Sequence, residues 1–140
     1  MRIHVLIAIA LSAIALASCA SGEKGAPGLA DGRLSPCPSS PNCVVSEAGA
    51  DEKHAVAPLP AEAWAEVPAA VADLGGTVVE QTDDYIAAEF KSRIFRFTDD
   101  VEFRLADDAV HVRSASRIGY SDMGVNRKRV EALRAALAGE

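Results

Sequence analysis

The sequence predicts a single α+β domain in which an antiparallel meander of four to five strands carries two helices on one face. Two amphipathic helical patterns indicate this fold, one that begins at Ala61 and one over 127–138. Between them lie short stretches rich in β-branched and aromatic residues, which Asp-rich turns separate. The order helix, meander, helix is typical of a two-layer domain whose helices pack on the same side of the sheet.

The first helix is predicted by apolar residues that recur at helical spacing and share one face: Trp64, Val67, Val71 and Leu74. Pro68 lies inside this pattern, and proline lacks the amide hydrogen that a helix interior requires. We therefore expect Pro68 to kink the helix or divide it into two pieces. The pair Gly75-Gly76 predicts the end of the helix, because glycine adopts the left-handed conformation that commonly terminates one.

The strands are predicted by apolar and β-branched stretches that turn residues separate. The expected strands are 77–81, 85–90, one through Phe95 and Phe97, 101–105 and 109–114. The expected turns are 82–84, 98–100 and 106–108, which have turn composition. Val101, Phe103 and Leu105 alternate along the chain and therefore share one strand face.

The last helix is predicted over 127–138, where Val130, Leu133 and Leu137 fall on one face, and Asn126 is expected to be its N-cap. Two helices cover only one face of the sheet. The opposite face therefore needs cover or polar side chains. The proline-rich segment 34–60 is expected to supply part of this cover.

The N-terminus has the pattern of an export signal. Arg2 precedes an apolar run over 5–17, which is too short to span a bilayer comfortably as a helix. The run ends in Leu16-Ala17-Ser18-Cys19, which resembles the lipobox of bacterial lipoproteins. The resemblance implies that Cys19 becomes the first residue of the mature chain and carries acyl chains such as palmitate, which together anchor a protein firmly. The alternative is an ordinary cleaved signal with an incidental cysteine.

This interpretation divides the chain into a signal peptide (1–18), a lipidated Cys19 with a flexible, Gly-rich tether (19–33) and one α+β domain (34–140). It predicts a protein of the bacterial cell envelope that is anchored to a membrane and faces the periplasm. Ala20 stands where some bacteria use Asp to retain lipoproteins in the inner membrane, which slightly favours the outer membrane.

Removal of residues 1–18 leaves 13 Lys and Arg residues against 20 Asp and Glu residues, a net charge of −7. A chain this acidic is not expected to bind nucleic acid. The charges are unevenly distributed, because 19–90 carry 3 bases and 12 acids whereas 91–140 carry 10 bases and 8 acids. Within the second half, 113–129 hold five bases and one acid. This stretch is therefore the candidate for an anion site.

Cys37 and Cys43 are the two cysteines left besides Cys19, and in an exported chain they are expected to form a disulfide. A metal site and a redox pair are the alternatives. A metal site would need further ligands, and His54 and His111 are isolated in the sequence. A redox pair more often has the spacing C-x-x-C at a helix start. We therefore expect a structural disulfide, no metal and no cofactor.

Period-2 geometry places Arg113 and Arg117 on one face of the last strand, with Val110 and Val112 on the core side. The loop 118–124 then leads to a helix that begins with three bases, Arg127, Lys128 and Arg129. Bases have the wrong sign for a helix N-terminus, where the dipole favours anions by about 0.3–1 kcal/mol per charge. These cations therefore need a negative partner.

The negative partner is either internal or external. Asp99, Asp100 and Asp122 are available for internal ion pairs. The external alternative is a phosphate or carboxylate held by arginine side chains and helix N–H groups. The candidate ligand-binding residues are Arg113, Arg117, Tyr120, Asp122, Asn126, Arg127 and Arg129.

Three motifs carry a family resemblance. They are SPCPSSPNCVVS at 35–46, FTDDVEF at 97–103 and RSASRIGYSDMGVNRKRVE at 113–131. Together they resemble the bacterial family known as domain of unknown function 1499, over about 34–138. The resemblance implies exported or membrane-associated relatives but no established activity, so it assigns no catalytic residue.

Three functions remain open. The first is binding of an anionic small molecule or lipid headgroup by the Arg-rich strand, loop and helix. The second is a structural or assembly role in the envelope, with an internal Arg/Asp network and an unknown protein partner. The third is a hydrolase that acts on an anionic ester with Asp99, Asp100 and Asp122 as acid–base groups. It has the least support, because adjacent aspartates are common in turns.

Overall fold

The computed structural model describes residues 25–139, so the predicted signal peptide, Cys19 and the first part of the expected tether lie outside the described residues. The elements are β1 (Leu29–Ala30), β2 (Arg33–Leu34), β3 (Cys43–Val45), β4 (Leu59–Pro60), the 3-10 helix η1 (Ala61–Glu66), α1 (Val67–Asp73), β5 (Thr77–Gln81), β6 (Tyr85–Lys91), β7 (Thr98–Leu105), β8 (Ala109–Ser116) and α2 (Val125–Ala138). No helix of this part of the chain is long and apolar enough to cross a membrane.

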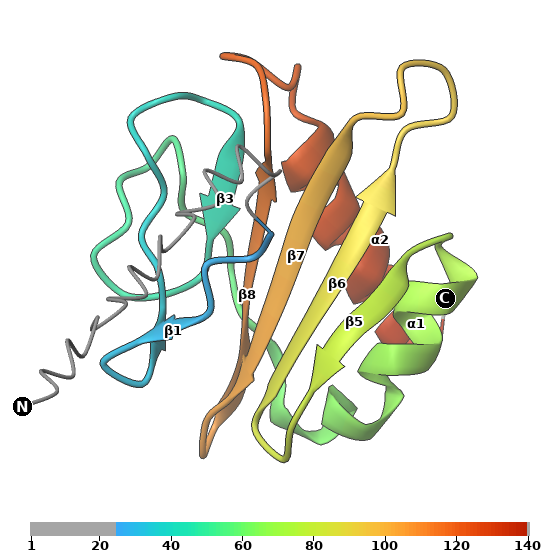
Figure 1. Ribbon diagram of the computed structural model, residues 1–140. Coiled ribbons are helices and arrows are strands. Elements are labelled where there is room, and N and C mark those ends of the chain that lie inside the picture. Colours follow the sequence, from blue (N-terminus) through green and yellow to red (C-terminus); the bar gives the residue numbers. More distant parts are fainter. Residues whose placement is uncertain (1–24, 140) are drawn as a thin grey trace, which may run out of the picture.

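A six-stranded sheet forms the centre of the domain. Its strand order is β3-β8-β7-β6-β5, with β4 also paired to β8, and every pairing is antiparallel. Strands β5 to β8 form the predicted meander. Helices α1 and α2 lie together behind the sheet, whereas the N-terminal segment with β1 and β2 lies in front of it (Figure 1). The prediction of an α+β fold with both helices on one face is confirmed.

The side of the sheet that faces the helices forms the hydrophobic core. Phe103 of β7 is fully buried and lies directly between Ile86 of β6 and Val112 of β8. The helices contribute Val67, Val71, Val130 and Leu133 to the same cluster. Full burial of side chains of this size stabilises the fold by about 1.5–3 kcal/mol each, so this layer holds the helices on the sheet.

Pro68 divides the first helix into two pieces, as predicted. The 3-10 helix η1 ends at Glu66 and α1 begins at Val67, so Pro68 lies in the first turn of α1. In that position the missing N–H has no cost, since helical hydrogen bonds begin later. Gly75, with φ of +82°, follows the helix end.

The connection between β6 and β7 differs from the prediction. A turn was expected over 98–100 and a strand through Phe95 and Phe97, and both expectations are wrong. Residues 98–100 begin β7, and 92–97 form the loop. The turn prediction rested on composition, because adjacent aspartates are common in turns. Instead each accepts a hydrogen bond from an arginine, on opposite faces of the sheet, while the two phenylalanines are exposed and stack with ring centroids 5.5 Å apart.

The face of the sheet opposite the helices is covered by the N-terminal part of the domain, as expected for the segment 34–60. The apolar residues in this contact include Leu34, Val45, Tyr85 and Ala87. The cover begins earlier than predicted, because the later part of the expected tether, from Gly25 onward, also lies against the sheet. The N–H of Gly28, for example, donates to Oε1 of Glu102 at 2.9 Å.

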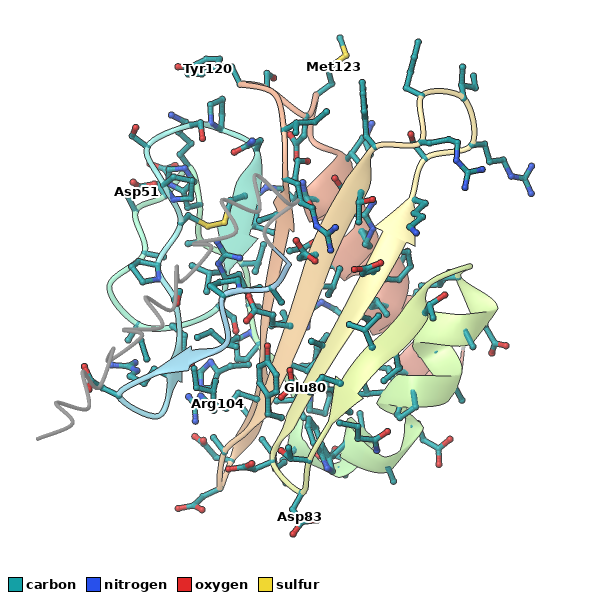
Figure 2. All side chains as sticks on the ribbon, in the orientation of Figure 1. Asp51, Glu80, Asp83, Arg104, Tyr120 and Met123 are labelled. Carbon is teal, nitrogen blue, oxygen red and sulfur yellow. A yellow bond between two sulfur atoms is a disulfide. The ribbon has the colours of Figure 1, made fainter. Side chains whose placement is uncertain are left out.

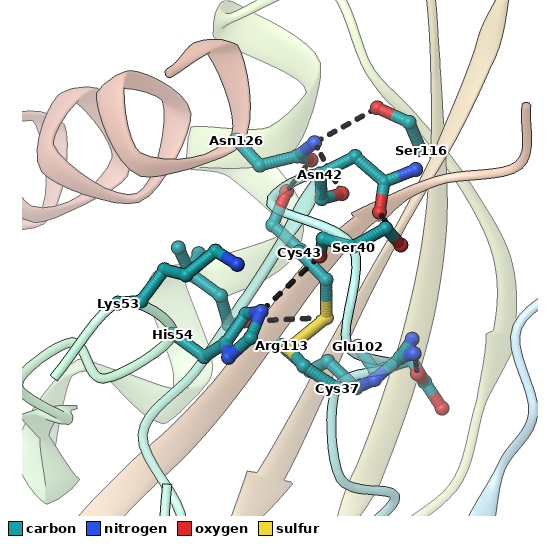
Figure 3. Close-up of a disulfide and its surroundings, with 12 residues drawn as sticks. Cys37, Ser40, Asn42, Cys43, Lys53, His54, Glu102, Arg113, Ser116 and Asn126 are labelled. Atoms are coloured by element: carbon teal, nitrogen blue, oxygen red, sulfur yellow. Dashed lines mark hydrogen bonds and ion pairs between the residues drawn. A yellow bond between two sulfur atoms is a disulfide. The ribbon is translucent and has the colours of Figure 1, made fainter. Parts of the chain in front are cut away.

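Cys37 and Cys43 form the predicted disulfide, with their Cα atoms 5.6 Å apart (Figure 3). Cys43 begins β3 and pairs with Ala115 of β8. The bridge therefore ties the proline-containing loop 38–42 to the edge of the sheet. Closing a loop this short stabilises a fold by about 2 kcal/mol.

Gly76 offers a test of the packing between α1 and the sheet. A Cβ atom at this position would lie 2.5 Å from Cζ of Phe90, whose side chain is buried in the core. We predict that Gly76→Ala lowers the free energy of unfolding by about 1–3 kcal/mol through overpacking, measured by urea denaturation. Gly25→Ala is the control, because a Cβ there meets only an ordinary contact. Equal stability of the two variants would contradict this packing.

Candidate functional site

The sheet face under the N-terminal segment carries a layer of charged side chains, which we call the charged face. Its residues occupy alternate positions of β6, β7 and β8: Glu89, Asp100, Glu102, Arg104, Arg113 and Arg117 (the last directly after β8). Because side chains alternate along a strand, the apolar residues between them face the helices. Asp100, Glu102 and Arg113 are buried. A buried charge is costly unless it is paired, so each of these side chains requires a partner.

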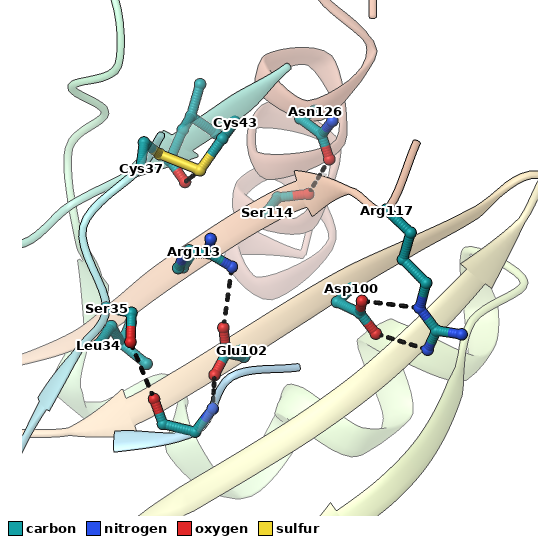
Figure 4. A network of polar contacts seen from close by, with 12 residues as sticks. Leu34, Ser35, Cys37, Cys43, Asp100, Glu102, Arg113, Ser114, Arg117 and Asn126 are labelled. Carbon is teal, nitrogen blue, oxygen red and sulfur yellow. Dashed lines mark hydrogen bonds and ion pairs between the residues drawn. A yellow bond between two sulfur atoms is a disulfide. The ribbon is translucent and has the colours of Figure 1, made fainter. Parts of the chain in front are cut away.

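Arg117 is held by two carboxylates at the end of β8. Its Nε and Nη2 donate to the two oxygens of Asp100, both at 2.8 Å (Figure 4). Nη2 also donates to Glu89. The hydrogen bonds to Asp100 raise the pKa of Arg117 above its ordinary value, against the effect of burial. The two-point contact fixes the plane of the guanidinium. Nε and Nη2, one of the two edges by which a guanidinium can bind an anion, are therefore occupied by carboxylates of the fold.

Glu102 is fully buried at the centre of the charged face. Its Oε2 accepts a hydrogen bond from Nη1 of Arg113 at 3.2 Å, and its Oε1 accepts from the hydroxyl of Tyr85 and the N–H of Gly28, each at 2.9 Å. Burial raises the pKa of Glu102, although these hydrogen bonds act in the opposite direction. Burial and the adjacent Glu102 also raise the pKa of Tyr85 well above its ordinary value. The Gly28 contact joins the N-terminal segment to the sheet.

Glu47, from the segment between β3 and β4, forms the second buried cluster. It accepts hydrogen bonds from Nε and Nη2 of Arg104 at 2.8 and 3.0 Å, from the N–H of Leu34 at 3.1 Å and from Nε of Arg33 at 3.1 Å. Burial opposes the ionisation of Glu47, but these contacts and the nearby His111 outweigh it and lower the pKa to about 2. One carboxylate thus links β2, β7 and the segment after β3.

Arg129 lies on the helix side of the sheet, in the first turns of α2. Its Nη2 donates to Asp99 at 2.7 Å, and its Nη1 donates to Asn126 at 2.9 Å and to Ser114 at 3.2 Å. The guanidinium also stacks on the ring of Phe90, 4.9 Å from the centroid. Asp99, which the sequence offered for internal pairing, is therefore the partner of Arg129.

The N-terminus of α2 is capped by Asp122, and the prediction that Asn126 is the N-cap is wrong. Gly124 occupies the N-cap position with φ of +79°. Asp122 accepts hydrogen bonds from the N–H groups of Gly124 at 2.8 Å and Asn126 at 3.0 Å. Burial opposes its ionisation, but these bonds lower its pKa. Asn126 is instead fully buried inside the first turn, where its amide donates to Asn42 and Ser116.

The two remaining predicted site residues are exposed. Arg127 donates to the backbone carbonyls of Lys53 at 2.9 Å and Ala55 at 2.8 Å. Tyr120 projects from the loop between β8 and α2, at one end of the molecule (Figure 2). Neither side chain forms a hydrogen bond with Arg113 or Arg117.

The predicted site residues are thus divided between the two faces of the sheet. Asp122, Asn126 and Arg129 lie together on the helix side. Arg113 and Arg117 lie on the charged face. The structure therefore does not bring the seven residues into one cluster, which is the arrangement that capture of a single anion by all of them would require.

Sequence reasoning missed the carboxylates that pair with Arg113 and Arg104, which are Glu102 and Glu47. Glu102 does carry a signal, because charged residues at 100, 102 and 104 alternate with core residues and so predict a polar second face. Glu47 carries none. It stands in an irregular segment whose position on the sheet no periodic pattern defines.

A hollow of about 430 Å³ opens between the β1–β2 hairpin and the segment 45–54, away from the predicted site. Its wall is mostly apolar and includes Cys37, Glu47 and His54. Nδ1 of His54 lies 2.9 Å from Asp51, and its Nε2 lies 3.1 Å from the carbonyl of Ser40. Over residues 25–139, no group of three or more His, Cys, Asp or Glu side chains is arranged to hold a metal ion.

Fold and site together define a two-layer α+β domain whose second sheet face is a buried layer of paired charges. A family model described as "Protein of unknown function (DUF1499)" matches residues 33–137, and the chain belongs to this family. The resemblance that the three sequence motifs carry is thereby confirmed. No curated protein and no solved structure matches the chain significantly.

The pKa of Glu47 predicts how stability depends on pH. It is about 2 in the folded protein against an ordinary value of 4.5. Ionised Glu47 therefore makes its full contribution to stability when the pH is above the ordinary pKa of 4.5. This contribution is lost as the pH falls toward 2. We predict that Glu47→Gln lowers the free energy of unfolding by about 2–3 kcal/mol at neutral pH and less at low pH.

The measurement is urea denaturation from neutral pH to about pH 2.5, where wild type should lose more stability than Glu47→Gln. Glu131→Gln serves as the matched control, because the exposed carboxylate of Glu131 pairs with Arg134 on the helix surface. Parallel pH profiles for wild type and Glu47→Gln would contradict the assignment.

Proposed function

We propose that the chain is a lipid-anchored domain of the bacterial envelope with a structural or assembly role, in which the Arg-rich strand and helix bind the domain's own carboxylates. The two-point contact between Arg117 and Asp100 carries this proposal. It favours the internal Arg/Asp network over the capture of an anionic ligand.

Capture of an anion by these arginines has less support, because the ligand would have to displace carboxylates of the fold. A carboxylate in the same chain competes at a high effective concentration, which a dissolved anion rarely reaches. Arg113 is also only 7% exposed, and its Nε, which has no partner among the described residues, is buried and out of reach of a dissolved anion.

A hydrolase has less support for the same reason. A general acid or base must reach the proton of a bound substrate. Asp99 and Asp100 are bound to arginines, and Asp122 caps a helix. Each aspartate that the sequence offered for catalysis therefore has a structural contact instead.

The network supports a structural role because it fastens the first part of the domain to the sheet. Gly28 and Leu34 donate their N–H groups to Glu102 and Glu47, respectively. The lipid-bearing end of the chain would enter the domain through this segment. A pull on the anchor would thus be transmitted to the sheet rather than to a loose tail.

A substitution of Arg117 tests the internal network. Arg117→Met leaves Asp100 without its cation, and we predict a loss of about 2–4 kcal/mol in the free energy of unfolding, measured by urea denaturation. Lys53→Met, at an exposed side chain, is the control and should change stability by less than about 0.5 kcal/mol. Millimolar inorganic phosphate should leave the Tm of wild type unchanged. A phosphate-dependent rise in Tm that Arg117→Met abolishes without loss of stability would instead establish anion capture.

The lipid anchor is tested by the intact mass of the chain isolated from bacterial membranes. We predict that wild type begins at Cys19 and carries acyl chains, whereas Cys19→Ser lacks the added lipid mass. The neighbouring Ser21→Ala should retain it, because it leaves the cysteine and the residues before it unchanged. A wild-type chain that begins elsewhere and carries no lipid would contradict the anchor.

A further inference from the structure

Two loops at one end of the sheet expose apolar side chains, which we call the apolar tip: Ile94, Phe95, Phe97, Ile118, Tyr120, Met123 and Val125. The first three lie in the loop between β6 and β7, and the others lie between β8 and the start of α2. The loops are neighbours, because the N–H of Arg117 donates to the carbonyl of Thr98 at 3.2 Å. Figure 2 shows Tyr120 and Met123 at this end and the β6–β7 loop beside them.

The exposure at the tip is concentrated. Seven of the ten exposed large hydrophobic side chains of residues 25–139 belong to it, and the other three are scattered. Ile94 is 83% exposed and Met123 is 87% exposed. Single exposed apolar residues are ordinary, but a concentration of them on neighbouring loops at one end of a domain is typical of a surface that binds a partner.

The charges next to the tip indicate the kind of partner. The segment 91–97 contains Lys91, Arg93 and Arg96 and no acid, although the whole chain has a net charge of −6. Within the described part of the chain, the side chains of Arg93 and Arg96 form no hydrogen bond or ion pair. Aromatic and aliphatic side chains flanked by bases are the composition of segments that enter the interface of an anionic bilayer. A partner protein would not require this combination.

The path of the chain places a membrane near the same end. Gly25 lies against Arg117, since a Cβ at Gly25 would be 3.8 Å from Nη2 of the arginine. Gly25 is six positions after Cys19, with five residues between them. Six Cα–Cα steps span at most about 20 Å even when the chain is fully extended. A lipid on Cys19 would therefore hold the bilayer within about 20 Å of the strand end from which the second tip loop departs.

We propose that the apolar tip inserts into the interfacial region of an anionic phospholipid bilayer and that Arg93 and Arg96 bind the phosphate groups of its lipids. The position of the membrane rests on the proposed anchor, whereas the affinity of the tip for lipid does not. The tip and the anchor together fix the domain with its sheet end toward the bilayer. The opposite end, with the β5–β6 turn at Asp83, then faces the aqueous compartment (Figure 2).

The test places a nitroxide label on the full chain, isolated as the bacterium processes it, in vesicles of phosphatidylethanolamine and phosphatidylglycerol. Ile94→Cys labels the tip, and Asp83→Cys labels the opposite end as the matched control. We expect the label at 94 to be accessible to oxygen and protected from a water-soluble nickel relaxant, and the label at 83 to show the reverse. Equal exposure of both labels to the nickel relaxant would overturn the proposal, and would leave a protein as the partner of the tip.

A second arm measures the contribution of charge. Replacing both Arg93 and Arg96 by Gln should reduce the ratio of immersed to water-exposed tip label about 25-fold, at about fivefold per base. Vesicles of uncharged phosphatidylcholine should have a similar effect on the wild-type tip. Immersion that neither change affects would overturn the role of the two arginines.

The intact mass of the same sample separates this proposal from the proposed anchor. If the chain is acylated but its tip label stays in water, the proposed anchor is supported and the proposed insertion of the tip is contradicted. If the chain carries no acyl groups, the proposed anchor is contradicted. Sedimentation with the same vesicles then tests whether the tip binds lipid. Binding that Ile94→Glu reduces at least tenfold would support the tip, whereas no binding would reject it.

Discussion

The contact between Glu102 and Arg113 is the constraint on which the rest of the domain depends. A carboxylate that is removed from water costs several kcal/mol unless a cation and further hydrogen bonds surround it. Arg113 supplies the cation, while Tyr85 and Gly28 supply the remaining donors. Since Gly28 belongs to the N-terminal segment, the carboxylate of Glu102 has all of these donors only when that segment is docked on the sheet.

The same pair also specifies how the strands align. Glu102 on β7 lies directly opposite Arg113 on β8. A slip of β7 by one residue would turn Glu102 toward the helices, away from Arg113, and turn Phe103 toward the charged face. A sheet with one apolar face already resists such a slip. The opposed charges on the second face add a penalty of their own, so the alternation on both faces selects a single register.

The sequence allowed prediction of those features that local periodicity or covalent chemistry determines. Alternation predicted the core side of β8, and the position of Pro68 predicted a divided first helix. Contacts between distant segments were not predictable in this way. Arg129 and Asp99 are 30 residues apart, and only the topology of the meander brings them together. The choice between an internal and an external anion depended on such contacts, so it had to stay open at the level of sequence.

The prediction for the β6–β7 connection was wrong for a different reason. Its run Ile94-Phe95-Arg96-Phe97 has the composition of a strand, and strand prediction assumes that apolar side chains find a core. Here the strand pairing ends at Lys91 and resumes at Thr98. The apolar residues between those ends have no core within reach and face outward. The error therefore marks a place where local composition and the fold disagree, and such disagreements concentrate at functional surfaces.

The excess of bases over 113–129 now has a structural explanation. Three of these five bases, Arg113, Arg117 and Arg129, pair with acids of β7, which lies earlier in the chain. A local excess of charge is therefore weak evidence for a ligand site, because the fold can supply the opposite charge from a distant segment. A stronger criterion is whether a base keeps its hydrogen-bonding capacity after folding. Among the described residues, the side chains of Arg93, Arg96 and Lys128 form no hydrogen bond or ion pair, and Arg93 and Arg96 stand in the loop that exposes Ile94, Phe95 and Phe97. By this criterion the tip of the sheet is a stronger candidate for a binding surface than Arg113, Arg117 and Arg129 are.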